Sequence, residues 1–493
     1  MKLITFELAS TLVLLLLPSS TDARPAAAAA SIAAVKTAPG VIELPLQRLS
    51  KRTRTRDEFL AKANFMRAKY GFDTSSTTES RSKRRRRAAG TVTMTAFQDA
   101  EYVGTISIGT PAESHSVILD TGSADLIMAA DDCKGCAATT NGYSAADSSS
   151  STSTSTSFSI TYGSGDASGT LVKDNVTISG YTVASQTFAS CTTMDNLVAG
   201  NISGLLGLGW QGLATSGAVP LVQALANSGD LPSKVFGFQF KSYAYDKLTS
   251  DYMTGGKMTI GGTDTSAYSG DINWVNIDSS KTYWQIPLDT ITVGGTDLGI
   301  SADNVVIDTG TTLIGAPVAA VAAIYAQISG AAAVSLSGSS GYYSIPCSGT
   351  YNVAFTFGNV SYAIPSDAFN TGQYDSSGNC LGAIFALTSS SSTGTGSSSL
   401  QWIIGDAFLT GVYSAYRFSF PAAVGFATLG SGGSAASGSS SSSSSTDSSS
   451  NKSMTSGSTR SASSWTVYPF AFTLGLLSLI LSTGFGPGDG PKI

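Results

Sequence analysis

Two aspartates in matching surroundings are the residues of this chain best placed to do chemistry. Asp120 lies in ILDTGSADL (118–126) and Asp308 lies in VVIDTGTTL (305–313), so each acid opens an Asp-Thr-Gly triplet behind an aliphatic run. Asp is a poor strand residue, and its burial costs free energy unless partners offset the cost. The repetition of this costly arrangement predicts that the two carboxylates share one function.

A pair of neighbouring carboxyls can activate water. Two carboxylates within hydrogen-bonding distance cannot both ionise cheaply, so one keeps a proton. The ionised acid then takes a proton from a water that attacks a carbonyl carbon, while the protonated acid donates to the carbonyl oxygen. Because the titration belongs to the pair, no separate role is assigned to Asp120 or Asp308.

The repeat extends beyond the triplets and indicates two similar halves. GLLGLGW (204–210) follows the first acid and WIIGDAFL (402–409) follows the second. We therefore expect a first lobe at 88–275 and a second at 276–430, each offering one Asp.

Short runs that alternate with period two, separated by Gly, Asn, Asp and Ser, predict an all-β fold. Helices are expected at 218–229 and 316–328. The stretch 144–157, nearly all Ser and Thr in its second half, is expected to be a loop.

Other chemistries lack their residues. His115 is the single His of the chain, which excludes a two-His zinc site, and no G-x-S-x-G motif supports a His-based triad. A lone His of this kind is expected at the surface. No phosphate-binding G-x-x-x-x-G-K-[ST] motif occurs either. We expect no metal and no cofactor.

The N-terminal segments indicate a secreted precursor. Residues 1–23 have the short apolar run and small terminal residues of a signal peptide, with an N-terminal anchor as the alternative. Residues 24–87 hold 16 basic and five acidic residues, whereas 88–493 hold 11 basic and 26 acidic ones. In a secreted chain this pattern predicts a basic propeptide, cleaved after the RSKRRRR run at 81–87, rather than a nucleic-acid-binding arm.

The C-terminal segments indicate attachment to a membrane. Residues 431–464 form a Ser/Gly-rich stalk, and 465–493 begin with an apolar run of about 17 residues, as in a glycolipid-anchor signal. Polar residues follow that run, so a short transmembrane helix is the alternative. We favour the lipid anchor, and both readings place the protein at the cell surface.

Cysteines and sequons agree with an oxidising compartment. Cys133 and Cys136 could form a tight local bridge, and Cys347 with Cys380 would close a loop of about 33 residues, leaving Cys191 free. Asn-X-Ser/Thr sequons occur at Asn175, Asn201, Asn359 and Asn451. Asn201 adjoins the apolar GLLGLG, and we expect it to be too buried for glycosylation.

These motifs together resemble those of the pepsin-like aspartic endopeptidases, the fungal secreted type most closely. The resemblance covers roughly residues 40–430 and implies a bilobal fold, with a catalytic cleft between two related β-barrel-like lobes. The aspartic-protease dyad is itself the standard example of a shared-proton pair. The implied protein is a monomeric acid endopeptidase, made as a zymogen, that takes polypeptide substrates and no nucleic acid.

Carried over position by position, the resemblance makes Asp120 and Asp308 the catalytic pair, with Thr121 and Thr309 bracing their loops. Substrate-binding positions are implied for Gly122, Ser123, Tyr162, Gly163, Ser164, Gly310, Thr311 and Thr312.

Within that set, Ser123 and Thr311 match hydroxyls that hydrogen-bond the outer carboxylate oxygens. The segment ITYGSGDASG (160–169) matches the substrate-covering flap, with Tyr162 as its tyrosine. The Cys347–Cys380 spacing matches the usual disulfide of the family.

The propeptide also matches. LPLQRLS (44–50) and RAKYGF (67–72) resemble the family's activation peptide, which would act as an inhibitor of its own enzyme. Lys69 would then lie between the two acids as a counter-ion, with Tyr70 beside it.

The chain departs from the family at two positions. Ile127 replaces the usual Trp seven residues after the first catalytic Asp, which implies a looser first subsite. Ser164 stands where some fungal members carry an acid that admits Lys, so we expect an apolar preference at the cleavage position. Its expected pocket walls are Ile118, Leu197, Ile202 and Leu205.

Two rival functions fit parts of the sequence. A pseudo-enzyme that binds a peptide or partner without cutting it would commonly lose an active-site residue, yet both triplets and Tyr162 are retained. A structural cell-surface mannoprotein would need more than the C-terminal Ser/Thr stalk. The sequence therefore favours an aspartic-type endopeptidase.

Overall fold

A computed structural model describes residues 36–38, 41–49, 56–72, 102–162, 165–195, 197–198, 200–241, 252–277, 282–388 and 400–430. All of them belong to one compact unit, Met1–Ser437, which is separate from Gly438–Ile493. The expected signal peptide, processing site, stalk and hydrophobic tail lie outside the described residues. Within the described ranges, no helix is long and apolar enough to cross a bilayer.

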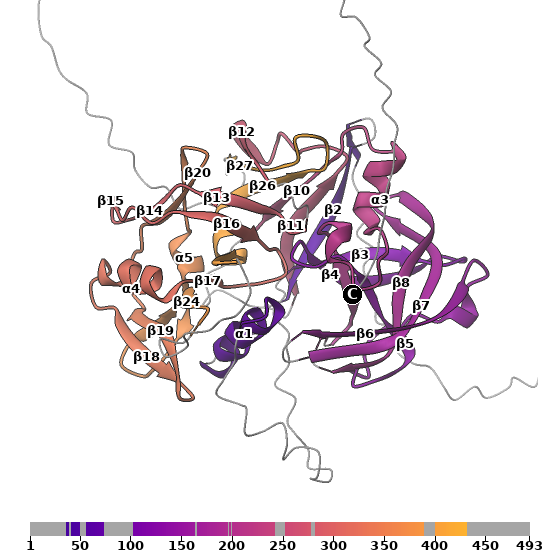
Figure 1. Ribbon diagram of the computed structural model, residues 1–493, viewed down its shortest axis with the longest axis horizontal. Helices are drawn as coiled ribbons and strands as arrows, with labels where there is room; N and C mark the ends of the chain where they lie inside the picture. Colours follow the sequence, from indigo (N-terminus) through magenta and orange to yellow (C-terminus); the bar gives the residue numbers. More distant parts are fainter. Residues whose placement is uncertain are drawn as a thin grey trace, which may run out of the picture. The chain divides into compact units, whose positions relative to one another are not determined.

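Six strands of the N-terminal half form a closed barrel (Figure 1). In spatial order they are β3 (Tyr102–Ile108), β4 (Glu113–Asp120), β9 (Ile202–Gly207), β5 (Leu126–Lys134), β8 (Tyr181–Asp195) and β7 (Gly165–Ile178). The ring closes because β3 also pairs with β7. Strand β6 (Thr152–Tyr162) forms a hairpin with β7 at the edge of this sheet.

The same sheet continues through strands from three parts of the chain. They are β2 (Val41–Leu49), β11 (Tyr252–Ile260), β10 (Val235–Phe240), β26 (Val412–Arg417), β27 (Ala423–Leu429) and β12 (Tyr268–Asn276), with β1 (Lys36–Ala38) paired to β2. Strand β2 belongs to the expected propeptide and lies between β11 and β3. The expected propeptide therefore contributes a strand to the main sheet.

The C-terminal half adds three smaller sheets. The first orders β13 (Gln285–Leu288), β16 (Ala302–Ile307), β25 (Trp402–Ile404), β17 (Ile314–Ala316) and β24 (Ile384–Ala386). The second orders β15 (Thr296–Asp297), β14 (Thr290–Val293), β20 (Val353–Phe357) and β21 (Val360–Ala363). The third orders β18 (Ala332–Leu336), β19 (Ser339–Pro346), β23 (Asn379–Gly382) and β22 (Asn370–Gln373). A closed barrel with further sheets agrees with the expected all-β, bilobal fold.

Helices are few among the described residues. They are α1 (Arg56–Lys69), α3 (Leu221–Ser228), α4 (Val318–Ala326), α5 (Ser366–Phe369) and α6 (Asp406–Leu409), with 3-10 turns at Ala145–Asp147 and Gln211–Leu213. Helices α3 and α4 confirm the two expected from sequence. Each begins after a proline, whose missing N–H costs nothing at a helix start.

Three local expectations are wrong. Residues 152–157 belong to β6 rather than to a loop, because β6 pairs with β7 and β-branched threonines suit a strand. His115 is buried within β4 rather than exposed, and its Nδ1 lies 3.1 Å from the carbonyl oxygen of Asn141. Asn201 is exposed, since it lies just before the start of β9.

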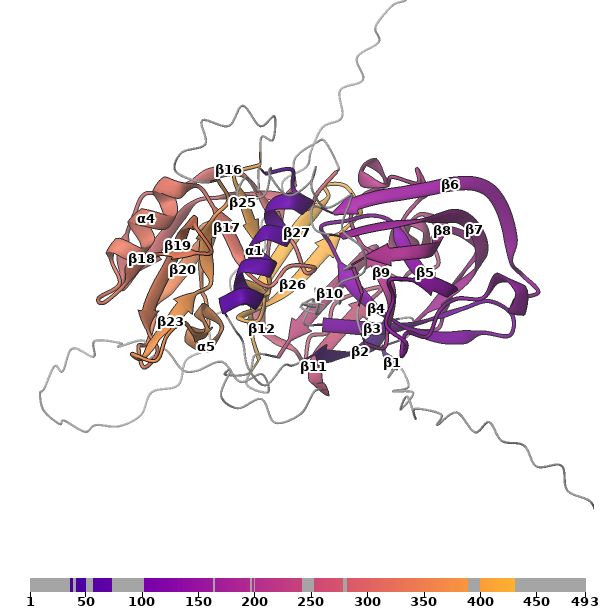
Figure 2. The same cartoon turned by 90° about the horizontal axis from the view of Figure 1, so that it is seen from below.

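Helix α1, which falls in the expected propeptide, lies between the two halves in both views (Figures 1 and 2). It contacts β6 of the barrel on one side and β17 and β18 of the C-terminal half on the other. Its buried residues Phe59, Ala63 and Met66 join an apolar cluster with C-terminal-half residues such as Leu313 and Phe385. This packing fixes the helix where the two halves meet.

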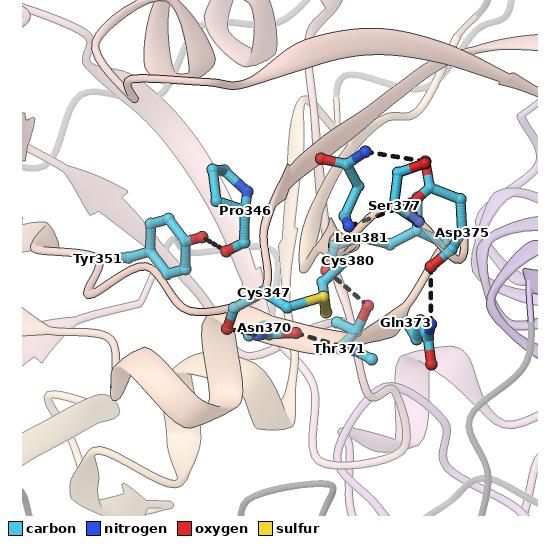
Figure 3. The surroundings of a disulfide bond; sticks show 12 residues. Pro346, Cys347, Tyr351, Asn370, Thr371, Gln373, Asp375, Ser377, Cys380 and Leu381 are labelled. Atoms are coloured by element: carbon cyan, nitrogen blue, oxygen red, sulfur yellow. Dashed lines mark hydrogen bonds between the residues drawn. A yellow bond between two sulfur atoms is a disulfide. The ribbon is translucent and has the colours of Figure 1, made fainter.

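Both expected disulfides are present. Cys133 bonds to Cys136 and Cys347 bonds to Cys380, while Cys191 is a buried free thiol. Figure 3 shows the second bridge, where Asn370 Nδ2 donates to the carbonyl oxygen of Cys347 at 3.0 Å. Burial raises the pKa of Cys191 to about 12, so this thiol is unreactive.

Candidate active site

The two aspartates occupy equivalent places in the two halves. Asp120 ends β4, which runs parallel to β9, and Asp308 follows β16, which runs parallel to β25. Leu208 N donates to Asp120 O at 2.8 Å, and Asp308 N donates to Ile404 O at 2.9 Å. The GLLGLGW and WIIGDAFL segments therefore supply the strands that hold the two acids, as the repeat predicted.

The two triplets are locked together by their threonines. Thr121 Oγ1 donates to Ile307 O at 2.8 Å, and Thr309 Oγ1 donates to Leu119 O at 2.7 Å. Each hydroxyl also accepts from the other triplet: Thr309 N lies 3.0 Å from Thr121 Oγ1, and Thr121 N lies 3.1 Å from Thr309 Oγ1. These four buried hydrogen bonds fix the distance between the two loops.

The glycines of the triplets make room for the opposite acid. A Cβ atom on Gly122 would lie 2.6 Å from Asp308 Cγ, and one on Gly310 would lie 2.2 Å from Asp120 Oδ1. Each glycine N–H also donates to its own triplet's carboxylate, at 2.9 Å for Gly122 and 2.8 Å for Gly310. Any side chain at these positions would push the carboxylates apart.

Lys69 bridges the two carboxylates. Its Nζ lies 2.7 Å from Asp120 Oδ1 and 2.9 Å from Asp308 Oδ2, and Tyr70 Oη donates to Asp308 Oδ2 at 2.8 Å. The side chains of all three charged residues are at most 2% exposed. The last turn of α1 therefore occupies the place where a substrate carbonyl and a water would have to lie.

Burial and Lys69 together set the protonation of the pair. Burial raises the pKa of Asp120 to about 6, which Lys69 opposes and the charge of Asp308 reinforces. Burial also acts to raise the pKa of Asp308, but Lys69 and the hydrogen bonds from Asp120, Lys69 and Tyr70 lower it below its usual value. The pKa of Asp120 is thus raised and that of Asp308 lowered while Lys69 is in place.

Lys69 itself stays charged. Burial alone would lower the pKa of this ammonium, but its attraction to Asp120 and Asp308 outweighs burial and raises the pKa. Burial followed by the two negative charges raises the pKa of Tyr70, so its phenol remains a hydrogen-bond donor.

The hydroxyls of Ser123 and Thr311 do not make the expected contacts. Among the described residues Ser123 Oγ has no hydrogen-bond partner, and Thr311 Oγ1 lies 3.4 Å from the main-chain oxygen of Asp308 rather than near its carboxylate. In this state Lys69, Tyr70 and the glycine N–H groups hold the carboxylate oxygens instead. Thr312 is buried beside them, and its carbonyl accepts from Ala407 N.

The flap lies partly outside the described residues. Backbone pairing places Tyr162 opposite Gly165 at the end of the β6–β7 hairpin, but the Tyr162 side chain, Gly163 and Ser164 are not described. Ile127 is buried in a barrel cluster that also holds Ile118, Leu197, Ile202 and Leu205. Phe65 of α1 packs against this cluster, which contains the expected pocket walls.

Sequence reasoning missed three residues near the site. The ring of Tyr283 lies 5.5 Å from that of Tyr70, and the adjacent Trp284 donates its indole N–H to Leu208 O at 2.9 Å, tying the start of β13 to the Asp120 loop. The third is Arg67, two residues before Lys69 and also buried. The segment YWQIPL showed only a strand pattern, so no signal separated its aromatics from ordinary core residues.

Comparison with known proteins places the chain in a family. Residues 101–429 match the family model described as eukaryotic aspartyl protease. The chain is a member of the eukaryotic aspartyl protease family. It is an aspartic endopeptidase. The chain is 42% identical to major aspartyl peptidase 1 of Cryptococcus neoformans var. grubii, over 71% of this chain and 73% of that protein.

Two further relatives have lower identity. An aspartic protease of Phaffia rhodozyma is 35% identical over 69% of this chain and 80% of its own length. Pepsin-3 of Oryctolagus cuniculus is 32% identical over 66% of this chain and 80% of its own length.

Proposed function

We propose that this aspartic endopeptidase is secreted as a zymogen and hydrolyses peptide bonds at acid pH with Asp120 and Asp308 acting as one pair. The single observation that carries the proposal is the Lys69 ammonium, within 3 Å of both carboxylates and shielded from solvent. A cation between the two carboxylates supports their assignment as the reactive pair, and it prevents a substrate from reaching them.

The proposed reaction begins once α1 has left. Without Lys69, two carboxyls at this separation hold one proton between them at acid pH. The ionised member takes a proton from a water, the water oxygen attacks the carbonyl carbon of the substrate, and the protonated member donates to the carbonyl oxygen. The threonine bridges support this step, because they hold the two acids at a fixed separation.

Proposed latency follows from the same contacts. Strand β2 pairs with β11 and β3, and α1 covers the carboxylates, so the propeptide is attached at two places. The RSKRRRR run at 81–87 is the proposed cleavage site. In this proposal the propeptide inhibits its own enzyme until acid loosens α1.

The pH of release depends on the sign of each pKa shift. The lowered pKa of Asp308 stabilises the folded zymogen above the ordinary carboxyl value of about 4, and this contribution is lost as the pH falls through the lowered pKa. The raised pKa of Asp120 works in the other direction, adding stability at low pH and withdrawing it as the pH rises through about 6. Protonation of Asp308 removes its ionic contact with Lys69, so α1 should be released below about pH 4.

The finer features of the proposal rest on the sequence. The signal-like residues 1–23 support secretion, and the stalk and tail at 431–493 support attachment to the cell surface through a glycolipid, with a short transmembrane helix as the alternative. We further propose a monomer that prefers apolar residues at the cleavage position, supported by Phe65 on the apolar barrel cluster.

The experiment is an assay of the full-length chain after acid maturation, with a denatured protein as substrate, from about pH 3 to about pH 7. Asp308→Asn and a statine-type transition-state mimic provide two independent blocks. We expect activity at acid pH that both blocks abolish. A folded, matured protein that binds the mimic and cuts nothing at any pH would refute the enzyme proposal in favour of a binding module.

A further inference from the structure

Arg67 is held in a built pocket of the C-terminal half. Its side chain is 5% exposed, although it lies on a propeptide helix. Nε donates to Leu387 O at 3.1 Å, Nη2 donates to Ala386 O at 2.5 Å, and Nη1 donates to the hydroxyl of Tyr342. A further contact, from Nη1 to Asn64 Oδ1 at 3.3 Å, stays within α1.

Two aromatic rings complete this pocket. The guanidinium carbon lies 5.0 Å from the ring centroid of Tyr342 and 5.1 Å from that of Phe385, and the two rings are inclined to one another by 20°. Both distances are within the range of cation–π attraction. The pocket therefore recognises a flat cation with ring faces, a phenol oxygen and two main-chain carbonyls.

The pocket does not depend on Arg67 for its shape. Phe385 and Ala386 belong to β24, which pairs with β17, and Leu387 N donates to Ala316 O at 2.9 Å. Tyr342 belongs to β19, which pairs with β18 and β23. These pairings join strands of the C-terminal half and include no residue of α1.

The pocket is also close to the reactive carboxylates. Arg67 lies two residues before Lys69 in the last turn of one helix, so their side chains leave α1 on nearly opposite faces, one toward the pocket and one toward the aspartates. Because Lys69 contacts both aspartates, the pocket is within reach of a substrate residue only a few positions from the cleaved bond.

We propose that Tyr342, Phe385 and the carbonyl oxygens of Ala386 and Leu387 form a subsite of the released enzyme for an arginine side chain of the substrate. This inference rests on the proposed removal of the propeptide. It adds a basic preference at a second position to the apolar preference at the cleavage position.

Arginine fits this subsite better than the alternatives. A lysine ammonium is a point charge that lacks the planar fork with which a guanidinium meets the two rings and both carbonyl oxygens. An aliphatic side chain would cover the two carbonyl oxygens without supplying donors, which is costly for a buried acceptor. Citrulline keeps the shape and N–H donors of arginine but carries no charge, so it isolates the cation–ring attraction.

The test uses the matured enzyme and a peptide series with one susceptible bond. Arginine, citrulline, lysine or leucine is placed in turn at each position on either side of the bond. At one position we expect kcat/KM for arginine to exceed that for citrulline by about tenfold. Lysine should rank below arginine there, and the other positions should show no such ratio.

Variants of the pocket residues then test whether the pocket causes the difference in kcat/KM between arginine and citrulline peptides. Phe385→Leu removes a ring, and Tyr342→Phe removes the hydroxyl acceptor, so each should shrink the arginine-to-citrulline ratio severalfold. Tyr343→Phe is the matched control, because Tyr343 stacks on Tyr325, at a centroid distance of 4.4 Å, in a different cluster. Its ratio should equal that of the wild type.

Two results would overturn the inference: no position at which arginine surpasses citrulline, or a ratio that neither pocket variant changes. The first needs only the wild-type enzyme, so it stands even if a variant fails to fold. Hydrolysis of the leucine and citrulline peptides would continue in either case. Loss of all hydrolysis would instead count against the proposed function itself.

Discussion

Replacing Lys69 by methionine is the sharpest perturbation of the zymogen. Methionine has a similar length and no charge, so the helix keeps its apolar packing while both carboxylates lose their counter-ion. Without the ammonium, the pKa values of Asp120 and Asp308 should both rise, since Lys69 lowers each of them in the wild type.

The size of the effect follows from burial. Removing one partner of a buried ion pair costs about 3–5 kcal/mol, because the remaining charge is left without compensation. Here the Lys69 ammonium serves two carboxylates at 2.7 and 2.9 Å. Each 1.4 kcal/mol is a factor of ten, so α1 should release the aspartates about a hundredfold to several thousandfold more readily at neutral pH.

The assay is binding of a fluorescent statine-type mimic to the intact full-length zymogen, with chain integrity checked after each measurement. Apparent affinity falls with the fraction of molecules in which α1 is open. The wild type should exclude the mimic near pH 7 and admit it below about pH 4, whereas K69M should already bind it near pH 7.

Lys62→Met is the matched control. It changes the same residue type on the same helix, about 10 Å from Lys69 along the axis. We expect this variant to exclude the mimic as the wild type does. Equal exclusion of the mimic by K69M and the wild type at neutral pH would refute the argument that Lys69 holds the zymogen closed.

Two further predictions concern the paired loops. Thr121→Val removes two buried hydrogen bonds and should lower the free energy of unfolding by about 2–3 kcal/mol in urea titrations. Thr121→Ser keeps the hydroxyl and should retain most of the wild-type stability. Equal stability of the two variants would contradict the bracing role. Gly310→Ala places a Cβ 2.2 Å from Asp120 Oδ1 and should reduce kcat of the matured enzyme about a hundredfold or more. The near-UV circular dichroism spectrum should stay unchanged. A wild-type kcat would show that the two loops can move apart without loss of activity.

Much of the active site could be predicted from the sequence because its residues carry strong local signals. The two Asp-Thr-Gly triplets and the two aliphatic strands that follow them form a repeat, and the structure places all four segments equivalently. Lys69 rests on a different basis, the resemblance of RAKYGF to the family's activation peptide, and its contacts with both aspartates agree with the expected counter-ion.

Other features left no such signal. The Ser/Thr-rich start of β6 has the composition of a loop, and only its pairing with β7 makes it a strand. His115 has no local partner in sequence, and it is buried in β4, a strand of the barrel wall.

The sequence by itself determined which residues form the acid pair. The two acids, the glycines that make room for them and the threonines that brace their loops all lie in the two Asp-Thr-Gly triplets. Tertiary structure alone decided which distant groups meet them. The carbonyls of Ala386 and Leu387 and the rings of Tyr342 and Phe385 surround Arg67 from about 275 to 320 residues away. Main-chain carbonyls and ring faces are common to every chain, so only folding turns them into a site.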